Sequence, residues 1–187
     1  MIKSISITTP LRESDILSLK AGDRVLLQGV IYTARDAAHK RLVGLLREGK
    51  DLPIDLKSQV IYYTGPAPAR PGNIIGPAGP TTSYRMDPFT PDLLKAGLKG
   101  MIGKGDRGPA IVDAIKSHHA VYFAATGGAA ILYSRAIKKA TVAAYPELGP
   151  EAILRLEVED FPVIVAIDCA GINLYREGMR EYKVPKV

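Results

Sequence analysis

The chain has 187 residues, of which 47% are hydrophobic and 24% charged, and its formal net charge is +6. This balance suits one compact domain with a hydrophobic core and excludes a disordered chain. No apolar run reaches the roughly 20 residues that span a bilayer. The first ten residues also lack the apolar stretch of a secretory signal. We therefore expect a cytoplasmic protein that does not enter a membrane.

Cysteine and histidine content limits the metal chemistry available to the chain. Cys169 is its single cysteine, which excludes an internal disulfide and a cluster held by this chain's own thiolates. The histidines (His39, His118 and His119) do not have the spacing of a zinc-binding motif, so we expect no metal ligands here.

The positive charge is compatible with nucleic acid, anionic lipid or a small anion as a partner. Lysines and arginines are spread along the chain, aromatic residues make up only 6%, and no RNA- or DNA-binding motif is present. A small anionic ligand fits at least as well as a polymer. We expect no nucleic-acid partner.

The first part of the chain predicts strands and one helix. Runs rich in β-branched residues at 4–9 and 24–34 are typical of strands. Apolar residues then recur at helical spacing, with Asp36 as the expected N-cap and Gly49 at the expected end of the helix. A third strand is expected at 60–65.

Residues 65–80 contain five prolines and four glycines, which excludes a regular helix or a central strand. We interpret this stretch as an ordered surface loop rather than a linker between domains. Beyond it, helices are expected at 91–100, 109–119 and 129–140. Residues 101–108 are expected to form a short strand that runs into a glycine-rich turn, and further strands are expected at 120–128, 140–145, 152–161 and 163–169. The pattern predicts a mixed α/β domain.

Three segments, 33–39, 79–87 and 102–108, place cations or hydroxyls at turns between elements, where α/β folds build ligand sites. Arg35 is either a guanidinium fork for a carboxylate or a surface arginine paired with Asp36 or another neighbouring carboxylate. The hydroxyls of Thr81 and Thr82 either take part in a ligand site or cap the turn that follows. The GKG sequence around Lys104 is too short for a phosphate-binding P-loop.

Taken together, the segments ARDAAH (34–39), GPTTSYRMD (79–87) and IGKGDRG (102–108) resemble the β-subunit family of iron–sulfur hydro-lyases. This family includes class I fumarate hydratase and L(+)-tartrate dehydratase. The resemblance continues through TGGAA, YPELGPEAI and LEVEDFPVIVAID, and so covers nearly the whole chain. It implies a swivelling β/β/α fold with a mixed sheet, in a single catalytic domain over residues 1–187.

The resemblance also implies a division of labour between two subunits. An α subunit would hold a four-iron–four-sulfur cluster through its own cysteines, and the two subunits would share the active site in a heterotetramer. On the present chain, Arg35, Arg85 and Lys104 correspond to substrate-binding residues and Thr81 to the catalytic base. Cys169 is not expected to be a cluster ligand.

The chemistry of a dicarboxylate substrate agrees with these assignments. Two arginines and a lysine can hold two carboxylates and stabilise the charge that builds up when a neighbouring proton is removed. A threonine hydroxyl is a weak base in water, so nearby cations would have to favour its ionised form. We expect the β subunit of a fumarate hydratase. The alternatives are the β subunit of L(+)-tartrate dehydratase and a non-catalytic anion-binding or assembly module.

Overall fold

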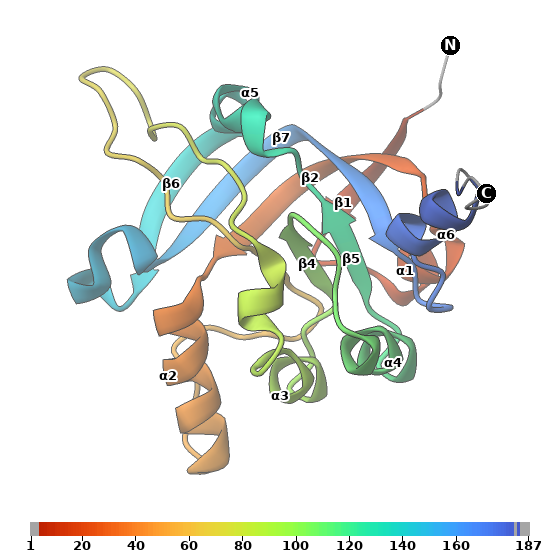
Figure 1. The fold of residues 1–187 in the computed structure, drawn as a ribbon. Helices are drawn as coiled ribbons and strands as arrows, with labels where there is room; N and C mark the ends of the chain where they lie inside the picture. Colours follow the sequence, from red (N-terminus) through yellow and green to blue (C-terminus); the bar gives the residue numbers. More distant parts are fainter. Residues whose placement is uncertain (1–3, 182, 184–187) are drawn as a thin grey trace.

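A computed structural model describes residues 4–181 and 183 of the chain. Its strands are β1 (Ile5–Thr9), β2 (Arg24–Thr33), β3 (Val60–Tyr62), β4 (Gly100–Gly103), β5 (Val121–Ala124), β6 (Ile137–Ala144) and β7 (Ile153–Ile167). They form one mixed sheet in the order β1-β2-β3-β4-β5-β7-β6, and β2 also pairs with β7. This second pairing closes the central strands into a small barrel (Figure 1). The predicted mixed α/β domain is confirmed.

The helices surround this sheet. They are α1 (Glu13–Ser18), α2 (Asp36–Arg47), α3 (Thr90–Lys95), α4 (Pro109–Ser117), α5 (Ala130–Ala136) and α6 (Leu174–Glu181). Short 3-10 helices are η1 (Ser83–Met86), η2 (Gly127–Ala129) and η3 (Pro146–Glu151). Helices α2, α3 and α4 lie next to one another along one side of the sheet (Figure 1). No helix of the described chain is long and apolar enough to cross a membrane.

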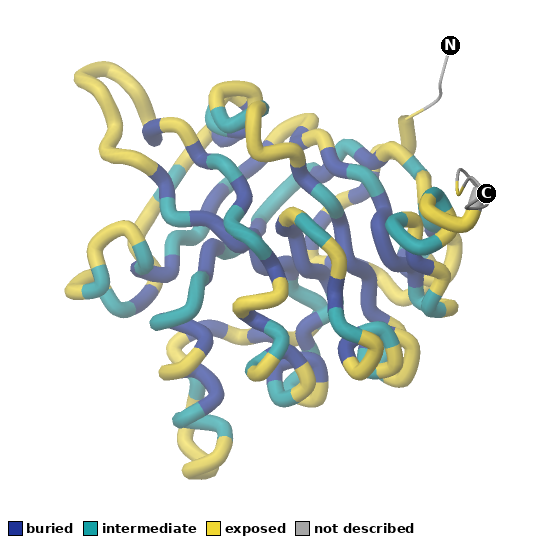
Figure 2. Tube along the Cα trace, viewed as in Figure 1, coloured by how far each residue is buried: buried dark blue, intermediate teal, exposed yellow. Residues whose placement is uncertain are grey.

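Strands β3, β4 and β5 are buried on both faces because two hydrophobic clusters enclose them. Tyr62 and Phe123 point into the cluster inside the barrel. Ile61 and Tyr122, one residue away, point into the cluster beneath α2, α3 and α4. Figure 2 shows these strands as the dark centre of the molecule. Continuous apolar sequence is expected of parallel strands covered on both sides.

The two strands expected at 152–161 and 163–169 are one long strand, β7, so this prediction was wrong at Pro162. Pro162 pairs with Leu26 of β2. On its other side, β7 pairs with β6 only as far as Val158 and with β5 only from Ile164. Because the edge opposite β2 is open between these pairings, the missing proline N–H breaks no ladder there.

The prediction of a helix at 129–140 was also wrong in its length. Helix α5 ends at Ala136, and Ile137 begins β6 opposite Val158 of β7. Pairing with a neighbouring strand therefore overrides the local helical pattern. Helices α1 and α6 were not predicted at all.

The proline-rich segment 65–80 is an ordered loop, as predicted. The Ala67 N–H donates to Pro77 O at 3.1 Å, which joins the two sides of the loop. The buried Tyr62 hydroxyl donates to Ala78 O at 2.6 Å and fixes its end to the barrel. The loop lies alongside α5 and β6 (Figure 1) and is largely exposed (Figure 2).

Candidate active site

The candidate site lies at one edge of the sheet, where β2, β3, β4 and β5 end. These strands run parallel, so their carboxyl ends share that edge. Arg35 comes two residues after the end of β2, and Lys104 comes directly after β4. The edge beyond the carboxyl ends of parallel strands is the common place for a ligand site in such folds.

The segment that contains Thr81 is inserted between the ends of β3 and β4. The Thr81 N–H donates to Tyr63 O at 2.6 Å, and its carbonyl accepts from the Lys104 N–H at 3.3 Å. The Ser83 N–H returns a bond to Lys104 O at 3.0 Å. A Cβ on Gly103 would lie only 1.9 Å from Ser83 Oγ, so this close packing requires glycine. Thr81 and Lys104 are therefore direct neighbours.

Main-chain bonds, rather than threonine side chains, hold this turn. Thr82 occupies the N-cap position of η1, but its side chain makes no capping hydrogen bond. It pairs with Lys104 in a parallel bridge. The capping interpretation is therefore wrong for Thr82, while the role of Thr81 stays a prediction.

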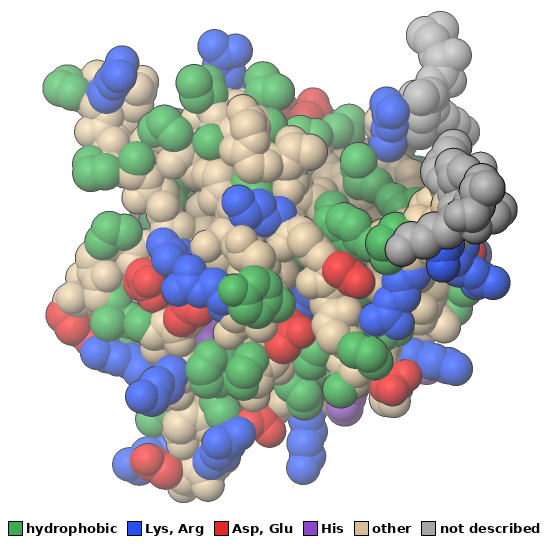
Figure 3. All heavy atoms as spheres, viewed as in Figure 1, with side chains coloured by type: hydrophobic (Ala, Val, Ile, Leu, Met, Phe, Trp, Pro, Cys, Tyr) green, Lys and Arg blue, Asp and Glu red, His purple; other side chains and the backbone are tan. Residues whose placement is uncertain are grey.

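The two predicted arginines meet at the start of α2. Arg85, on η1, places Nη2 2.7 Å from Asp36 Oδ2. Arg35 places Nη2 3.4 Å from Glu151 Oε1. The expected N-cap was wrong by one residue, because Arg35 occupies that position and Asp36 is the first residue of α2. Figure 3 shows basic and acidic side chains next to one another over this part of the surface.

Lys104 reaches towards the end of β5. Its Nζ lies 3.6 Å from where a Cβ on Gly127 would be. The preceding Thr126 N–H donates to the Tyr133 hydroxyl at 2.7 Å, which fixes the start of this glycine turn. The structure thus brings all four predicted residues to one edge, with Thr81 and Lys104 over β4 and the arginines over α2.

A buried arginine that the sequence analysis did not single out joins two of the motifs. The Arg107 side chain is fully buried, and its Nε donates to Asp87 Oδ1 at 2.6 Å. Its Nη2 donates to Thr90 Oγ1 at 2.7 Å. The guanidinium lies over the rings of Tyr63 and Tyr122, at 5.5 and 5.1 Å from their centroids. Arg107 thereby fixes segment 102–108 against segment 79–87.

Replacing Asp87 by alanine should destabilise the fold by about 3–5 kcal/mol, because it leaves the buried Arg107 charge without its carboxylate. The matched control is Asp92→Ala, which breaks the exposed pair with Arg47 and should cost about 1 kcal/mol or less. Urea unfolding of the isolated chain measures both. Equal losses in the two variants would contradict a dominant role for the buried pair.

His39 is a buried titratable group beneath Arg35. Its Nδ1–H donates to Arg35 O at 2.9 Å, and its ring meets that of Tyr63 edge-on at 5.2 Å between centroids. Burial lowers the pKa of His39 to about 4. The imidazole is therefore neutral in the folded chain at physiological pH.

This buried histidine predicts a loss of stability in acid. Between pH of about 6.5 and 4, the unfolded chain binds a proton at His39 that the folded chain does not, so stability falls as the pH decreases. We expect His39 to contribute about 2–3 kcal/mol of the loss between pH 7 and 4.5. The difference in unfolding free energy between these pH values should shrink by that amount in His39→Gln. An unchanged difference in His39→Gln would contradict this role of the buried histidine.

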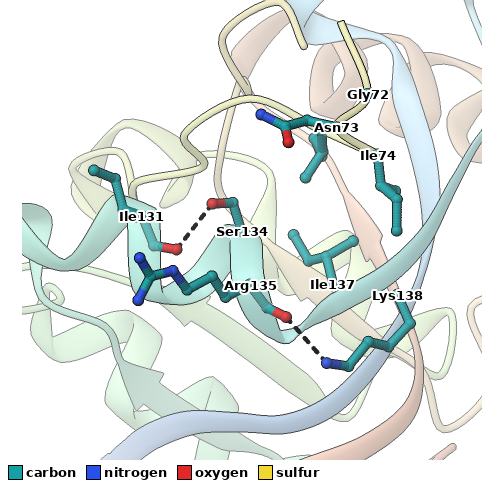
Figure 4. A pocket seen from close by; sticks show the side chains of 9 residues that line it. Gly72, Asn73, Ile74, Ile131, Ser134, Arg135, Ile137 and Lys138 are labelled. Atoms are coloured by element: carbon teal, nitrogen blue, oxygen red, sulfur yellow. Dashed lines mark hydrogen bonds between the residues drawn. The ribbon is translucent and has the colours of Figure 1, made fainter. Parts of the chain in front are cut away.

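A pocket of about 520 Å³ lies elsewhere, between the loop 65–80 and α5 (Figure 4). None of the four predicted residues lines it. Ser134 Oγ donates to Ile131 O, and Lys138 Nζ donates to Arg135 O, so these polar groups are bonded to nearby backbone. Ligand sites need polar groups that converge on the ligand. The strand edge is therefore the better candidate.

The donor groups of the described chain do not fit an iron–sulfur cluster. Residues 4–181 and 183 contain no cluster of three or more metal-ligating side chains. Cys169 is partly buried, and its Sγ lies 3.5 Å from Ile16 O. It packs against the core as a small thiol. A cluster would need ligands from another chain or domain.

Comparison with known proteins gives the family. The model of the fumarase C-terminus family matches residues 1–178. The chain belongs to the fumarase C-terminus family. The anaerobic class I fumarate hydratase of Escherichia coli is 38% identical over 178 residues, covering 92% of this chain and 32% of that enzyme. Fumarate hydratase 2 of Leishmania major is 41% identical over 161 residues, covering 84% of this chain and 28% of that protein.

A third relative has a different length. A candidate β subunit of L(+)-tartrate dehydratase from Methanocaldococcus jannaschii is 38% identical over 173 residues, covering 89% of each chain. This member of the fumarase C-terminus family thus spans about a third of the fumarate hydratases it matches, but most of the tartrate dehydratase subunit.

The structure places residues at the candidate site that the sequence did not indicate. Arg107 stands beside Asp106 between two glycines, a charged pair that could have been examined as a motif of its own. Asp36 was noted as a helix cap and as an alternative partner of Arg35, but not as the partner of Arg85. Glu151 lies far from Arg35 in the sequence, and no local pattern marks it as a partner.

Proposed function

We propose that this chain is the β subunit of a two-subunit class I fumarate hydratase, which hydrates fumarate reversibly to L-malate at a site shared with an α subunit. The observation that carries the proposal is that Arg35, Thr81, Arg85 and Lys104 lie at the same strand edge of a fumarase C-terminal domain, with Thr81 bonded to Lys104 and Arg85 paired at the start of α2. Relatives named class I fumarate hydratase support the substrate.

In this proposal, each residue has one role. Arg35 and Arg85 hold the substrate carboxylates, because a guanidinium offers paired N–H donors in the geometry of a carboxylate. Lys104, whose backbone is bonded to that of Thr81, adds a positive charge to the same strand edge. In the direction from malate, ionised Thr81 takes the proton from the carbon next to a carboxylate, the C–H electron pair forms the double bond, and the hydroxyl leaves from the neighbouring carbon. The fixed cations stabilise the charge that develops. A cluster held by the α subunit would supply a Lewis acid for the leaving hydroxyl.

We assign the iron–sulfur cluster to the α subunit, since the described donors of this chain do not fit it. The isolated chain, incubated anaerobically with iron and sulfide, should fold, bind no cluster and show no hydratase activity. Visible absorbance and iron analysis measure this. Cluster absorbance together with turnover of malate by the isolated chain would overturn the assignment.

A second candidate is the β subunit of L(+)-tartrate dehydratase, which would convert tartrate to oxaloacetate. The match over 89% of the relative from M. jannaschii favours it. Anaerobic co-expression with the α subunit, followed by assays on fumarate, L-malate and both tartrate enantiomers, separates the two. We expect turnover of fumarate and malate. Turnover of L(+)-tartrate alone would replace the first proposal with the second, and a loaded complex inactive on all four would contradict both.

We further propose that the two chains form a heterotetramer. Light scattering of the purified complex measures its mass. A mass equal to one copy of each chain would contradict this assembly.

A further inference from the structure

Each site arginine is paired with a carboxylate of this same chain. Asp36 lies 2.7 Å from Arg85, and Glu151 lies 3.4 Å from Arg35. Both acids also lie at the start of α2. Asp36 is its first residue, and the second oxygen of Glu151 accepts the Ala37 N–H at 3.0 Å. One helix start therefore holds both ion pairs.

Arg35 is further confined by backbone on its other side. A Cβ on Gly65 would lie 2.8 Å from Arg35 Nη1 and 3.0 Å from Pro150 O. The guanidinium thus lies against Gly65, a loop residue without a side chain that comes three residues after the end of β3. The Arg35 side chain is only 24% exposed. It therefore has less conformational freedom than an exposed surface arginine, which keeps most of its rotamers.

We infer that Glu151 and Asp36 are positioning residues, which aim Arg35 and Arg85 at the substrate carboxylates. The inference rests on the proposed function. Each pair uses one Nη2 group of its guanidinium, and Arg85, whose side chain is 44% exposed, keeps its other N–H groups for a ligand. Arg35 is held more closely, because its Nε is buried and its Nη1 lies against Gly65. Cations that are already oriented stabilise a transition state without reorganisation, so fixing them in advance increases the rate.

Removing the charge of one acid tests whether the acids orient the arginines or only reduce the positive charge of the site. Glu151→Gln removes a negative charge beside the site but keeps an oxygen that can accept the Ala37 N–H. If Glu151 only modulated charge, the variant would bind a dianion more tightly, with a lower KM and unchanged kcat. Positioning predicts the opposite, a kcat/KM roughly 10–100-fold lower.

Glu147→Gln is the matched control. Glu147 lies on the same 3-10 helix, η3, and pairs with Arg41 of α2 rather than with either site arginine. It should keep kcat/KM within about twofold of the wild-type complex. Asp36→Asn should behave like Glu151→Gln. Gly65→Ala should do so as well, since its Cβ would displace the Arg35 guanidinium.

A second readout needs no activity. In the ¹⁵N-labelled isolated chain, the heteronuclear NOE of Arg35 Nε–H should fall in Glu151→Gln and stay unchanged in Glu147→Gln. An unchanged NOE, or a lower KM with wild-type kcat, would overturn the positioning role. A wild-type complex inactive on every dicarboxylate would contradict the proposed function instead, and the NOE would still decide whether Glu151 orders Arg35.

Discussion

Replacing Thr81 by alanine or valine in the assembled enzyme is expected to lower kcat by roughly 10²–10⁴-fold, while the chain still folds and binds its partner. The reason is that Thr81 lies beside Lys104, and its turn is held by main-chain hydrogen bonds to Tyr63 and Lys104. Loss of the side chain should therefore remove the proposed base and leave the turn in place. Steady-state kinetics and thermal unfolding measure the two effects.

Two further variants sharpen this prediction. Thr81→Ser keeps the hydroxyl and should retain substantial activity. Thr82→Ala is the internal control, because Thr82 makes no side-chain cap and is not assigned a role in the reaction. Equal losses of kcat at both positions would contradict the assignment, and the proton acceptor would then have to be sought on the α subunit. A stability loss of about 1 kcal/mol with normal kcat would instead indicate a capping role for Thr81.

Replacing Arg85 by lysine is expected to cost about 2–5 kcal/mol of transition-state binding, although the charge is kept. An ammonium cannot reproduce the paired donors of a guanidinium. The neighbouring Asp36 carboxylate makes the change more severe, because it would attract the single ammonium that remains. The value of kcat/KM for the reconstituted enzyme measures this loss.

Arg47→Lys provides the control for this change. Arg47 is the last residue of α2, pairs with Asp92 of α3 and is 69% exposed. The same substitution at Arg47 should therefore leave kcat/KM unaltered. Near-normal kcat/KM in Arg85→Lys would contradict the carboxylate-binding role of Arg85.

The sequence predicted that several of the candidate site residues follow the ends of strands. Polar residues after β-branched runs placed Arg35 and Lys104 at strand ends, and parallel pairing brought those ends together. The closing of the barrel was not predictable in this way. It depends on β7 continuing through Pro162, which is possible only because β5 and β6 leave that edge open.

Ion pairs between segments that are distant in the sequence could not be predicted either. Local patterns report helix periods, strand alternation and turns, but they carry no signal for the contact between Arg35 and Glu151. The burial of Arg107 is a similar case. No local pattern marks Arg107 as buried, and Asp87, Thr90 and two tyrosine rings make its fully buried position possible.

The central claim is that this chain supplies essential residues to a dicarboxylate site completed by an α subunit. The most direct measurement is complementation, in which a cluster-loaded α subunit is assayed for malate dehydration alone, with this chain, and with its Thr81→Ala variant. We predict activity only with the wild-type chain, saturating at equal amounts of the two subunits. Full activity of the α subunit alone, or equal activity with the Thr81→Ala variant, would contradict the account.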